Sequence, residues 1–319
     1  MTLRQIVVMA AVAVALSSCG KRKTANGDAG TAAADTGYRE FPTVTVPGTI
    51  LPEDRAAYVV DHYWDRFDFR DTVYCHLPEV TEQAYADYIY LLPFVPRQQA
   101  IASINNLFDK AAADSVMFRY FVSLAEKYFY DPNSPYRNDE FYIPVLQKVL
   151  ASPYMDDVEK LRPENQLEMA MKNRVGDKAA DFVYTTADGR QSRLYDLASE
   201  YILLFIYNPD CATCESLRNE IGASPMLSEM IENGTLKVLA LYPDEDLTIW
   251  RGYRDSIPQT WINAYDKALK LRNDSLYDLK AIPSIYLLDK DKRVLLKDCS
   301  SVPMVEEALY YADSGDMAE

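Results

Sequence analysis

The sequence predicts an all-helical first half and a mixed α/β second half. In the second half, apolar segments of strand length occur at 201–207, 236–242 and 284–288, and segments with helical periodicity separate them. In the first half, apolar residues recur at the three- and four-residue spacing of helices instead. The length of 319 residues is sufficient for two domains.

The composition excludes one class of function. Hydrophobic residues make up 49% of the chain and charged residues 25%, which is the balance of a globular protein. The formal net charge is −15 at pH 7. A surface that binds nucleic acid needs concentrated positive charge to displace counterions. We therefore predict no nucleic-acid partner.

The amino terminus has the pattern of a secretion signal. Arg4 precedes an apolar run over 6–16, which has the length of a signal-peptide core and is too short to span a membrane. The sequence Leu16-Ser17-Ser18-Cys19 follows and resembles the bacterial lipobox. That resemblance implies cleavage before Cys19 and lipidation of its thiol, and predicts a lipoprotein signal peptide over 1–18. An ordinary secretory signal with a chance cysteine is the alternative.

Residues 19–48 are predicted to be a flexible tether, because they are rich in Lys, Ala, Gly, Thr and Asp and lack apolar periodicity. In lipoproteins, an Asp after the lipidated cysteine favours retention in the inner membrane, whereas Gly20 stands there in this chain. We therefore expect a lipid-anchored protein on the periplasmic or extracellular side. The outer membrane is favoured over the inner membrane as its location. Disulfides persist in such a compartment.

Residues 49–173 are predicted to form a helical domain. Pro52, followed by two acidic residues, favours a helix start, and Asp114 is a candidate N-cap. The further helices are expected at about 79–92, 97–113, 115–130, 139–150 and 156–172.

The isolated cysteines and histidines do not form a metal-binding pattern. Cys75 and His76 are adjacent, but the one other histidine is His62, and this set lacks the spacing of a zinc site. We predict no metal and interpret Cys75 as a packed residue. Cys299 follows the last strand and is either a buried thiol or the partner of Cys75, and the spacing does not decide between the two.

Residues 174–319 are predicted to form the α/β domain. Asp188-Gly189 indicates a hairpin turn, and the strand at 201–207 leads into Cys211 and Cys214. Two thiols at a strand-to-helix junction can close and reopen a disulfide, and the amino end of a helix favours a thiolate at the first of them. The other expected elements are a helix at 212–221, strands at 236–242, 284–288 and 293–296, a turn at 289–292 and a closing helix at 302–311.

This order of features resembles the thioredoxin fold, in the TlpA/ResA-like group of membrane-tethered thiol-disulfide oxidoreductases. The segment from Gly176 to Phe182 is similar to the G-x-x-A-P-D-F opening of that group. The two cysteines match its active-site pair, and Ala281-Ile282-Pro283-Ser284 matches the loop whose proline is cis. The helices ahead of this domain resemble an uncharacterised helical domain of some bacterial lipoproteins, which carries no known chemistry.

The resemblance implies a role for each residue of the site. Cys211 would attack the substrate disulfide, and Cys214 would resolve the mixed disulfide. Ile282 would offer backbone groups to an extended substrate, and Pro283, held cis beside the dithiol, would block metal capture. No cofactor is expected.

Several residues depart from the pattern of the group, among them Ala180, which stands where proline is usual. Asp210 replaces the usual aromatic residue before the first cysteine, and Glu215 follows the pair. Both carboxylates are expected to tune the dithiol by opposing negative charge on Cys211. Phe205 and Leu217 occupy places where relatives carry an acid, so we expect no side-chain relay for the proton of Cys214.

Two hypotheses for the function follow. The first is a membrane-anchored extracytoplasmic thiol-disulfide oxidoreductase, reductase or isomerase-like because no histidine lies between the cysteines. Its partners would be disulfide-bearing envelope proteins, a membrane electron donor that the sequence does not identify, and the membrane through the lipid anchor. The alternative is a redox-silent lipoprotein that serves as a binding or assembly module, with a structural disulfide between Cys211 and Cys214.

Overall fold

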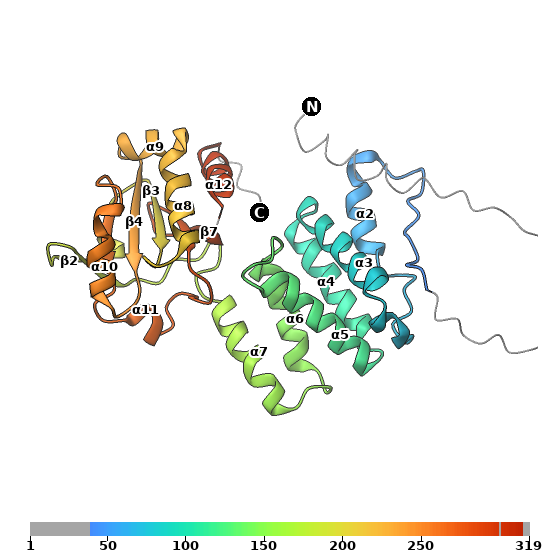
Figure 1. Ribbon diagram of the computed structural model, residues 1–319. Coiled ribbons are helices and arrows are strands. Elements are labelled where there is room, and N and C mark those ends of the chain that lie inside the picture. The colour runs from blue at the N-terminus through green and yellow to red at the C-terminus, as the bar shows by residue number, and fades with distance from the viewer. Residues whose placement is uncertain (1–38, 300, 315–319) are drawn as a thin grey trace, which may run out of the picture. The chain divides into compact units, whose positions relative to one another are not determined.

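The computed structural model describes residues 39–299 and 301–314 (Figure 1). The chain divides into two compact units, 1–128 and 129–319. The predicted signal peptide, Cys19 and most of the predicted tether lie outside the described residues. None of the helices within the described ranges is long and apolar enough to cross a membrane.

The first unit is helical, as predicted. Its α-helices are α2 (Arg55–His62), α3 (Pro78–Leu91), α4 (Arg97–Ala111) and α5 (Ser115–Ala125), and its 3-10 helices are Pro52–Asp54, Thr72–His76 and Leu92–Phe94. Aromatic rings fill the core: the Trp64 ring meets that of Phe121 edge-on, with centroids 5.2 Å apart, and both residues are buried. Asp114 caps α5, since its carboxylate accepts the backbone N–H groups of Val116 and Met117.

The predicted helix over 115–130 is confirmed, but its last five residues are π-helical and not α-helical. α5 ends at Ala125, and the chain continues as a π-helical turn over Glu126–Tyr130. A π-turn contains one more residue per turn than an α-helix, so it shifts the side chains that follow. The side chain of Phe129 is buried in this turn.

The second unit contains a seven-stranded sheet in the order β2-β1-β5-β4-β3-β6-β7. The strands are β1 (Val183–Thr186), β2 (Gln191–Arg193), β3 (Tyr201–Ile206), β4 (Leu236–Tyr242), β5 (Ile262–Tyr265), β6 (Ser284–Asp289) and β7 (Val294–Cys299). The three central strands β3, β4 and β5 are parallel, and β6 pairs antiparallel with β3. This mixed sheet with helices confirms the predicted α/β class.

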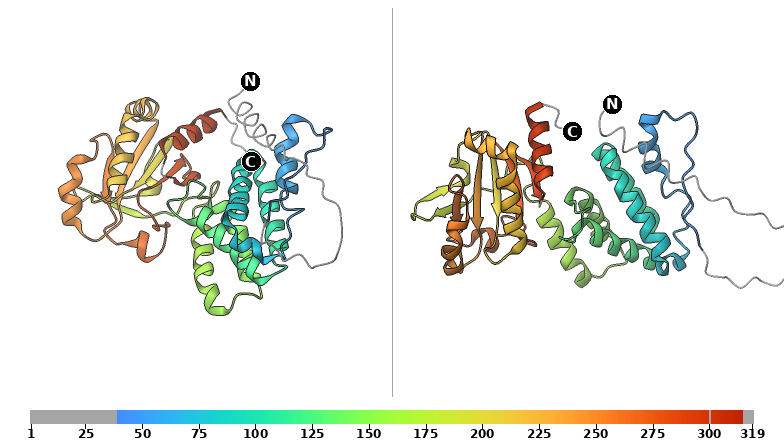
Figure 2. Two further views of the ribbon diagram at one scale, coloured as in Figure 1. Left: turned by 45° about the vertical axis from the view of Figure 1, so that its right-hand side comes forward. Right: turned by 45° about the horizontal axis from the view of Figure 1, so that its top comes forward.

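Helices cover both faces of the sheet (Figures 1 and 2). They are α8 (Ala212–Ala223), α9 (Pro225–Glu232), α10 (Leu247–Tyr253), α11 (Lys270–Asn273) and α12 (Val302–Ser314), with 3-10 helices at Leu194–Asp196 and Arg254–Ser256. Side chains of β3 alternate between the faces: Phe205 packs with α8, α9 and α12, and Leu204 packs against the segment around Tyr277. All six residues of β3 are buried, so this strand is the centre of the unit.

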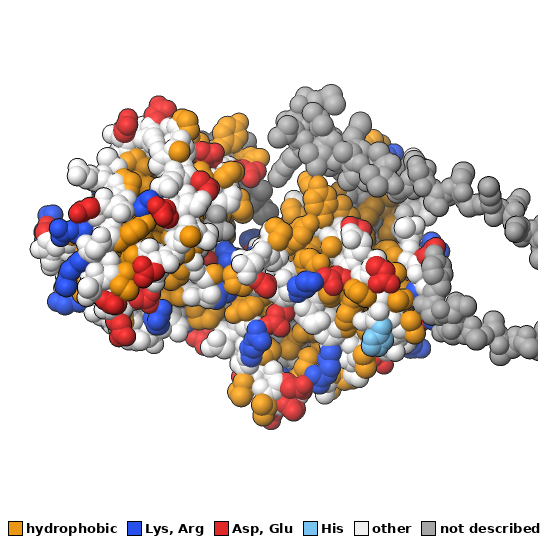
Figure 3. Space-filling model, in the orientation of Figure 1, with side chains coloured by type: hydrophobic (Ala, Val, Ile, Leu, Met, Phe, Trp, Pro, Cys, Tyr) orange, Lys and Arg blue, Asp and Glu red, His pale blue; other side chains and the backbone are white. Residues whose placement is uncertain are grey.

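Helices α6 (Asp139–Ala151) and α7 (Asp157–Ala170) belong to the same compact unit as the sheet. Each begins with a side-chain cap: Asn138 accepts the N–H of Phe141, and Asp156 forms a capping box with Glu159. The domain boundary expected at 173/174 stays a prediction. Figure 3 shows one face of the molecule, where Lys and Arg side chains are interspersed with Asp and Glu.

The sequence missed one strand. β5 is four residues long and contains the polar Asn263, so its apolar pattern is weaker than that of its neighbours. The predicted hairpin turn is confirmed: β1 pairs with β2, and Gly189 in the turn has φ +83°. Glycine tolerates this left-handed backbone without steric cost.

We predict that Asp114→Ala lowers the free energy of unfolding by about 1 kcal/mol, because two N–H groups of α5 lose their acceptor. Urea unfolding followed by helical circular dichroism measures the change. Asp54→Ala is the matched control, since Asp54 also stands at a helix start but its side chain makes no capping bond. An equal loss in both variants would contradict the capping role.

Candidate active site

The two cysteines lie where the central strand passes into a helix. β3 ends at Ile206, and α8 begins at Ala212 with Cys211 as its N-cap. The intervening turn is closed by Asn208, whose side-chain oxygen accepts the N–H of Asp210 at 3.1 Å. The chain therefore brings both thiols to the carboxyl end of β3 and to the amino end of α8.

The two thiols have different surroundings. Cys211 is half-buried, whereas Cys214 is 1% exposed. The sulfur of Cys211 accepts the backbone N–H of Cys214 at 3.1 Å, and the sulfur of Cys214 accepts that of Asn208 at 3.5 Å. The more accessible thiol is thus the first one, in agreement with the order expected from the sequence. An N–H group at a helix start stabilises negative charge on the sulfur that it contacts.

Burial changes the acidity of the second thiol, that of Cys214. It raises the pKa of Cys214 well above that of an ordinary thiol, because ionisation would place a charge in an apolar environment. The nearby sulfur of Cys211 raises the pKa of Cys214 further. Cys214 therefore keeps its proton at neutral pH until another group removes it.

A second loop approaches the dithiol from β6. The antiparallel pairing of β3 with β6 places Ile206 opposite Ser284, so the loop before Ser284 and the turn after Ile206 lie at the same edge of the sheet. In that loop the Ile282–Pro283 peptide bond is cis, as predicted. The thiol of Cys211 lies 3.6 Å from the carbonyl oxygen of Ile282, within hydrogen-bond reach for sulfur. The structure thus brings the dithiol, Ile282 and Pro283 together.

The two acidic residues flank the dithiol on different sides. Asp210 is exposed, and its carboxylate adds to a rise in the pKa of Tyr242 that comes first from burial and then from Asp244 and Asp246. Glu215 is exposed on α8, and its carboxylate lies 3.3 Å from the guanidinium of Arg218. Both residues are at the site, and their tuning of the dithiol stays a prediction.

Sequence reasoning missed three residues around the dithiol. The side-chain amide of Asn208 donates to Asp244 at 3.1 Å and so ties the turn to the end of β4. Arg218 has a largely buried side chain and donates to the hydroxyl of Tyr253. The four-residue spacing from Cys214 to Arg218 on one helix could have identified Arg218. No local pattern indicates Tyr253, which comes from α10.

The two other described cysteines lie elsewhere. The sulfur of Cys75 contacts that of Met117 at 3.8 Å in the first unit. Cys299 is buried in the core of the second unit, where its sulfur accepts the N–H of Ser301 at 3.2 Å. Of the two alternatives for Cys299, the structure agrees with the buried thiol. Among the described residues, no group of three or more His, Cys, Asp or Glu side chains is arranged to hold a metal ion.

Known proteins resemble the two parts of the chain. Residues 18–173 match a family described as a domain of unknown function, DUF5106. The crystal structure of a thioredoxin-like protein from Bacteroides caccae is 45% identical and covers 86% of this chain and 99% of its own, with a TM-score of 0.83.

Two further relatives match the second half only. The crystal structure of the C-terminal domain of an uncharacterised protein from Bacteroides fragilis is 46% identical and covers 43% of this chain and 98% of its own, with a TM-score of 0.42. The thiol-disulfide oxidoreductase ResA of Bacillus cereus is 26% identical over 130 residues, which are 40% of this chain and 70% of ResA.

We predict that iodoacetamide alkylates Cys211 in a Cys214→Ser variant at least about tenfold faster than Cys214 in a Cys211→Ser variant at neutral pH, because Cys214 is buried and retains its proton. Because burial raises the pKa of Cys214 to about 12, its alkylation rate should still be increasing at about pH 10, where the rate for an ordinary thiol levels off. Mass spectrometry of timed samples measures both rates. In urea the two rates should converge, and equal rates in the folded proteins would refute the difference in burial.

Proposed function

Because the chain belongs to the thioredoxin-like proteins, we propose that it is a thiol-disulfide oxidoreductase that acts outside the cytoplasm through Cys211 and Cys214. One observation carries this proposal. An accessible thiol caps a helix, a buried thiol lies one turn behind it, and a backbone carbonyl of the neighbouring loop lies 3.6 Å from the first sulfur. A purely structural disulfide requires neither the exposure of one sulfur nor this loop.

The first step of the proposed reaction occurs at Cys211. Its thiolate attacks one sulfur of a substrate disulfide, which forms a mixed disulfide and breaks the substrate S–S bond. The departing substrate sulfur leaves as a thiolate and takes a proton from water. The N–H of Cys214, which points at the sulfur of Cys211, favours the attacking charge.

The second step occurs at Cys214. After losing its proton, Cys214 attacks the sulfur of Cys211 and releases the second substrate thiol. The substrate disulfide gains two electrons and two protons, and the enzyme dithiol becomes a disulfide. Phe205 and Leu217 are buried apolar neighbours in the same core cluster as Cys214. The proton of Cys214 therefore passes to water or to the departing thiolate in this scheme.

The proposed direction of electron transfer and the proposed cellular location rest on the sequence. The pair encloses Ala212 and Thr213 and no histidine, and Asp210 precedes it, which favours a reductase or isomerase over an oxidase. A reductase needs a membrane electron donor to restore the dithiol, and its substrates would be disulfide-bearing envelope proteins. Lipidation of Cys19 would keep the enzyme at the membrane surface, more at the outer membrane than at the inner.

We predict that Cys214→Ser accumulates a mixed disulfide with a disulfide-bonded peptide, since the resolving thiol is absent. Cys211→Ser should lower the rate of peptide reduction at least about a hundredfold, because the buried Cys214 cannot take its place. Non-reducing gels and mass spectrometry identify the adduct, and Cys75→Ser is the control that should react like wild type. If wild type reduces no disulfide and the pair resists a strong reductant, the redox-silent alternative holds instead.

A separate prediction concerns the anchor. Expressed in a bacterium with the full amino terminus, the wild-type chain should sediment with membranes and should carry a lipid-modified amino-terminal peptide in mass spectrometry. Cys19→Ala should move the protein to the soluble fraction, because the lipid supplies the membrane affinity. Density-gradient separation then distinguishes inner from outer membrane. Unchanged sedimentation of Cys19→Ala would contradict lipid anchoring.

A further inference from the structure

Six charged side chains form a buried ion cluster in the second unit. Their side chains are between 5% and 11% exposed. Three carry positive charge and three carry negative charge, so the formal charges balance. The members of the buried ion cluster are Arg137, Asp139, Asp278, Lys280, Lys297 and Asp298.

The cluster is continuous, and Lys280 is its centre. The ammonium of Lys280 lies 2.7 Å from Asp278, 3.4 Å from Asp298 and 3.6 Å from Asp139. Burial alone would lower the pKa of Lys280, but the three carboxylates outweigh it and raise the pKa, so Lys280 remains a cation. The ring of Tyr130 lies 4.8 Å from the same ammonium and covers it.

On one side, the buried ion cluster holds both ends of the loop that faces the dithiol. Lys280 is the residue before this loop, which comprises 281–283. Ser284 is the residue after it, and its hydroxyl donates to Asp298 at 2.8 Å. The loop is therefore anchored at its two ends to the same set of charges, and its middle residue, Ile282, presents the carbonyl that lies near Cys211.

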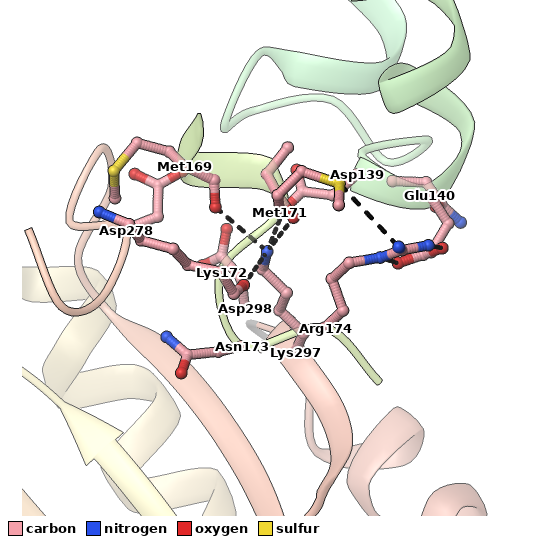
Figure 4. A network of polar contacts seen from close by, with 12 residues as sticks. Asp139, Glu140, Met169, Met171, Lys172, Asn173, Arg174, Asp278, Lys297 and Asp298 are labelled. Atoms are coloured by element: carbon pink, nitrogen blue, oxygen red, sulfur yellow. Dashed lines mark hydrogen bonds and ion pairs between the residues drawn. The ribbon is translucent and has the colours of Figure 1, made fainter. Parts of the chain in front are cut away.

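On the other side, the buried ion cluster holds α6 and α7. Asp139 is the first residue of α6, and Lys297 of β7 lies 2.9 Å from its carboxylate. The ammonium of Lys297 also donates to the carbonyl oxygens of Ala170 and Lys172 at the end of α7, at 2.8 and 2.7 Å (Figure 4). A cation at this end of a helix is stabilised by the helix dipole. The two helices and the loop thus share one set of ion pairs.

Burying six charged side chains costs free energy of desolvation, and the need to fill space does not explain why charged residues stand here. Apolar residues of similar volume often fill such a space with equal or greater stability. Ion pairs do, however, impose defined directions on the groups that they join, because each charge left without its partner is strongly unfavourable. The arrangement suits a loop whose backbone must be held in one place.

We propose that Lys280, Asp139 and Asp298 are positioning residues for disulfide exchange: through the buried ion cluster they hold the loop 281–283 against Cys211 and tie it to α6 and α7. This inference rests on the proposed function. The substrate class of the enzyme is then an extended peptide segment that carries a disulfide, because such a segment can form hydrogen bonds with the backbone of Ile282. A small disulfide without a peptide backbone makes no use of the loop.

The test compares two substrates in each variant. One is a disulfide-bonded peptide, and the other is bis(2-hydroxyethyl) disulfide. For Asp139→Asn and Lys280→Met we expect kcat/KM for the peptide to fall at least about tenfold, because a loop displaced by a fraction of an ångström no longer aligns the peptide with Cys211. The rate constant for the small disulfide should stay within about twofold of wild type.

Glu140→Gln is the matched control. Glu140 follows Asp139 in α6 and pairs with Arg174 at 2.8 Å, outside the loop and its two ends. It should react like wild type with both substrates, whatever its melting temperature. Ser284→Ala removes the hydrogen bond to Asp298 without changing any charge. This variant therefore tests the positioning role if a charge variant does not fold.

Three outcomes are distinguishable. Selective loss of the peptide reaction in the folded variants supports the positioning role. Equal loss with both substrates, or no loss with either, overturns it and leaves the cluster with a role in stability alone. If wild type itself reacts with neither substrate, the proposed function fails, and that result is separate from the comparison of variants.

Discussion

The antiparallel pairing of β3 with β6 is the constraint on which the site depends. Six register pairs join the strands, from Tyr201 opposite Asp289 to Ile206 opposite Ser284. They fix the end of β3 relative to the start of β6. The turn that carries the dithiol and the loop that carries Ile282 are therefore held at one edge. A shift by one residue would turn every side chain of β3 to the other face and exchange the two cores that it joins.

The sequence predicts the parts of this structure whose signals are local. Apolar runs identify β3, β4 and β6, and Asp188-Gly189 identifies the hairpin turn, because burial and turn geometry act over a few residues. The dithiol and the proline loop are likewise visible as short motifs. β5 escapes prediction because a four-residue strand that contains Asn263 has too few apolar residues to show a period.

The buried ion cluster could not have been predicted, for a different reason. Asp139 is far in the chain from Lys280 and Asp298, and a charged residue in a sequence is normally solvated. Only the folded chain brings them together, so their burial is a tertiary property. The contact between Tyr253 and Arg218 is also a tertiary property. The spacing from Cys214 indicates Arg218, but no local pattern indicates Tyr253.

The sulfur that closes the first turn of α8 differs from the oxygen of an ordinary cap, because its bonding would change in the proposed reaction. As a thiolate, Cys211 is a strong acceptor for the N–H of Cys214, and in a disulfide it is a poor one. In the proposed reaction, this hydrogen bond would be strongest in the thiolate state and weakest in the disulfide state. Hydrogen exchange at the backbone amide of Cys214 would then report the oxidation state of the dithiol.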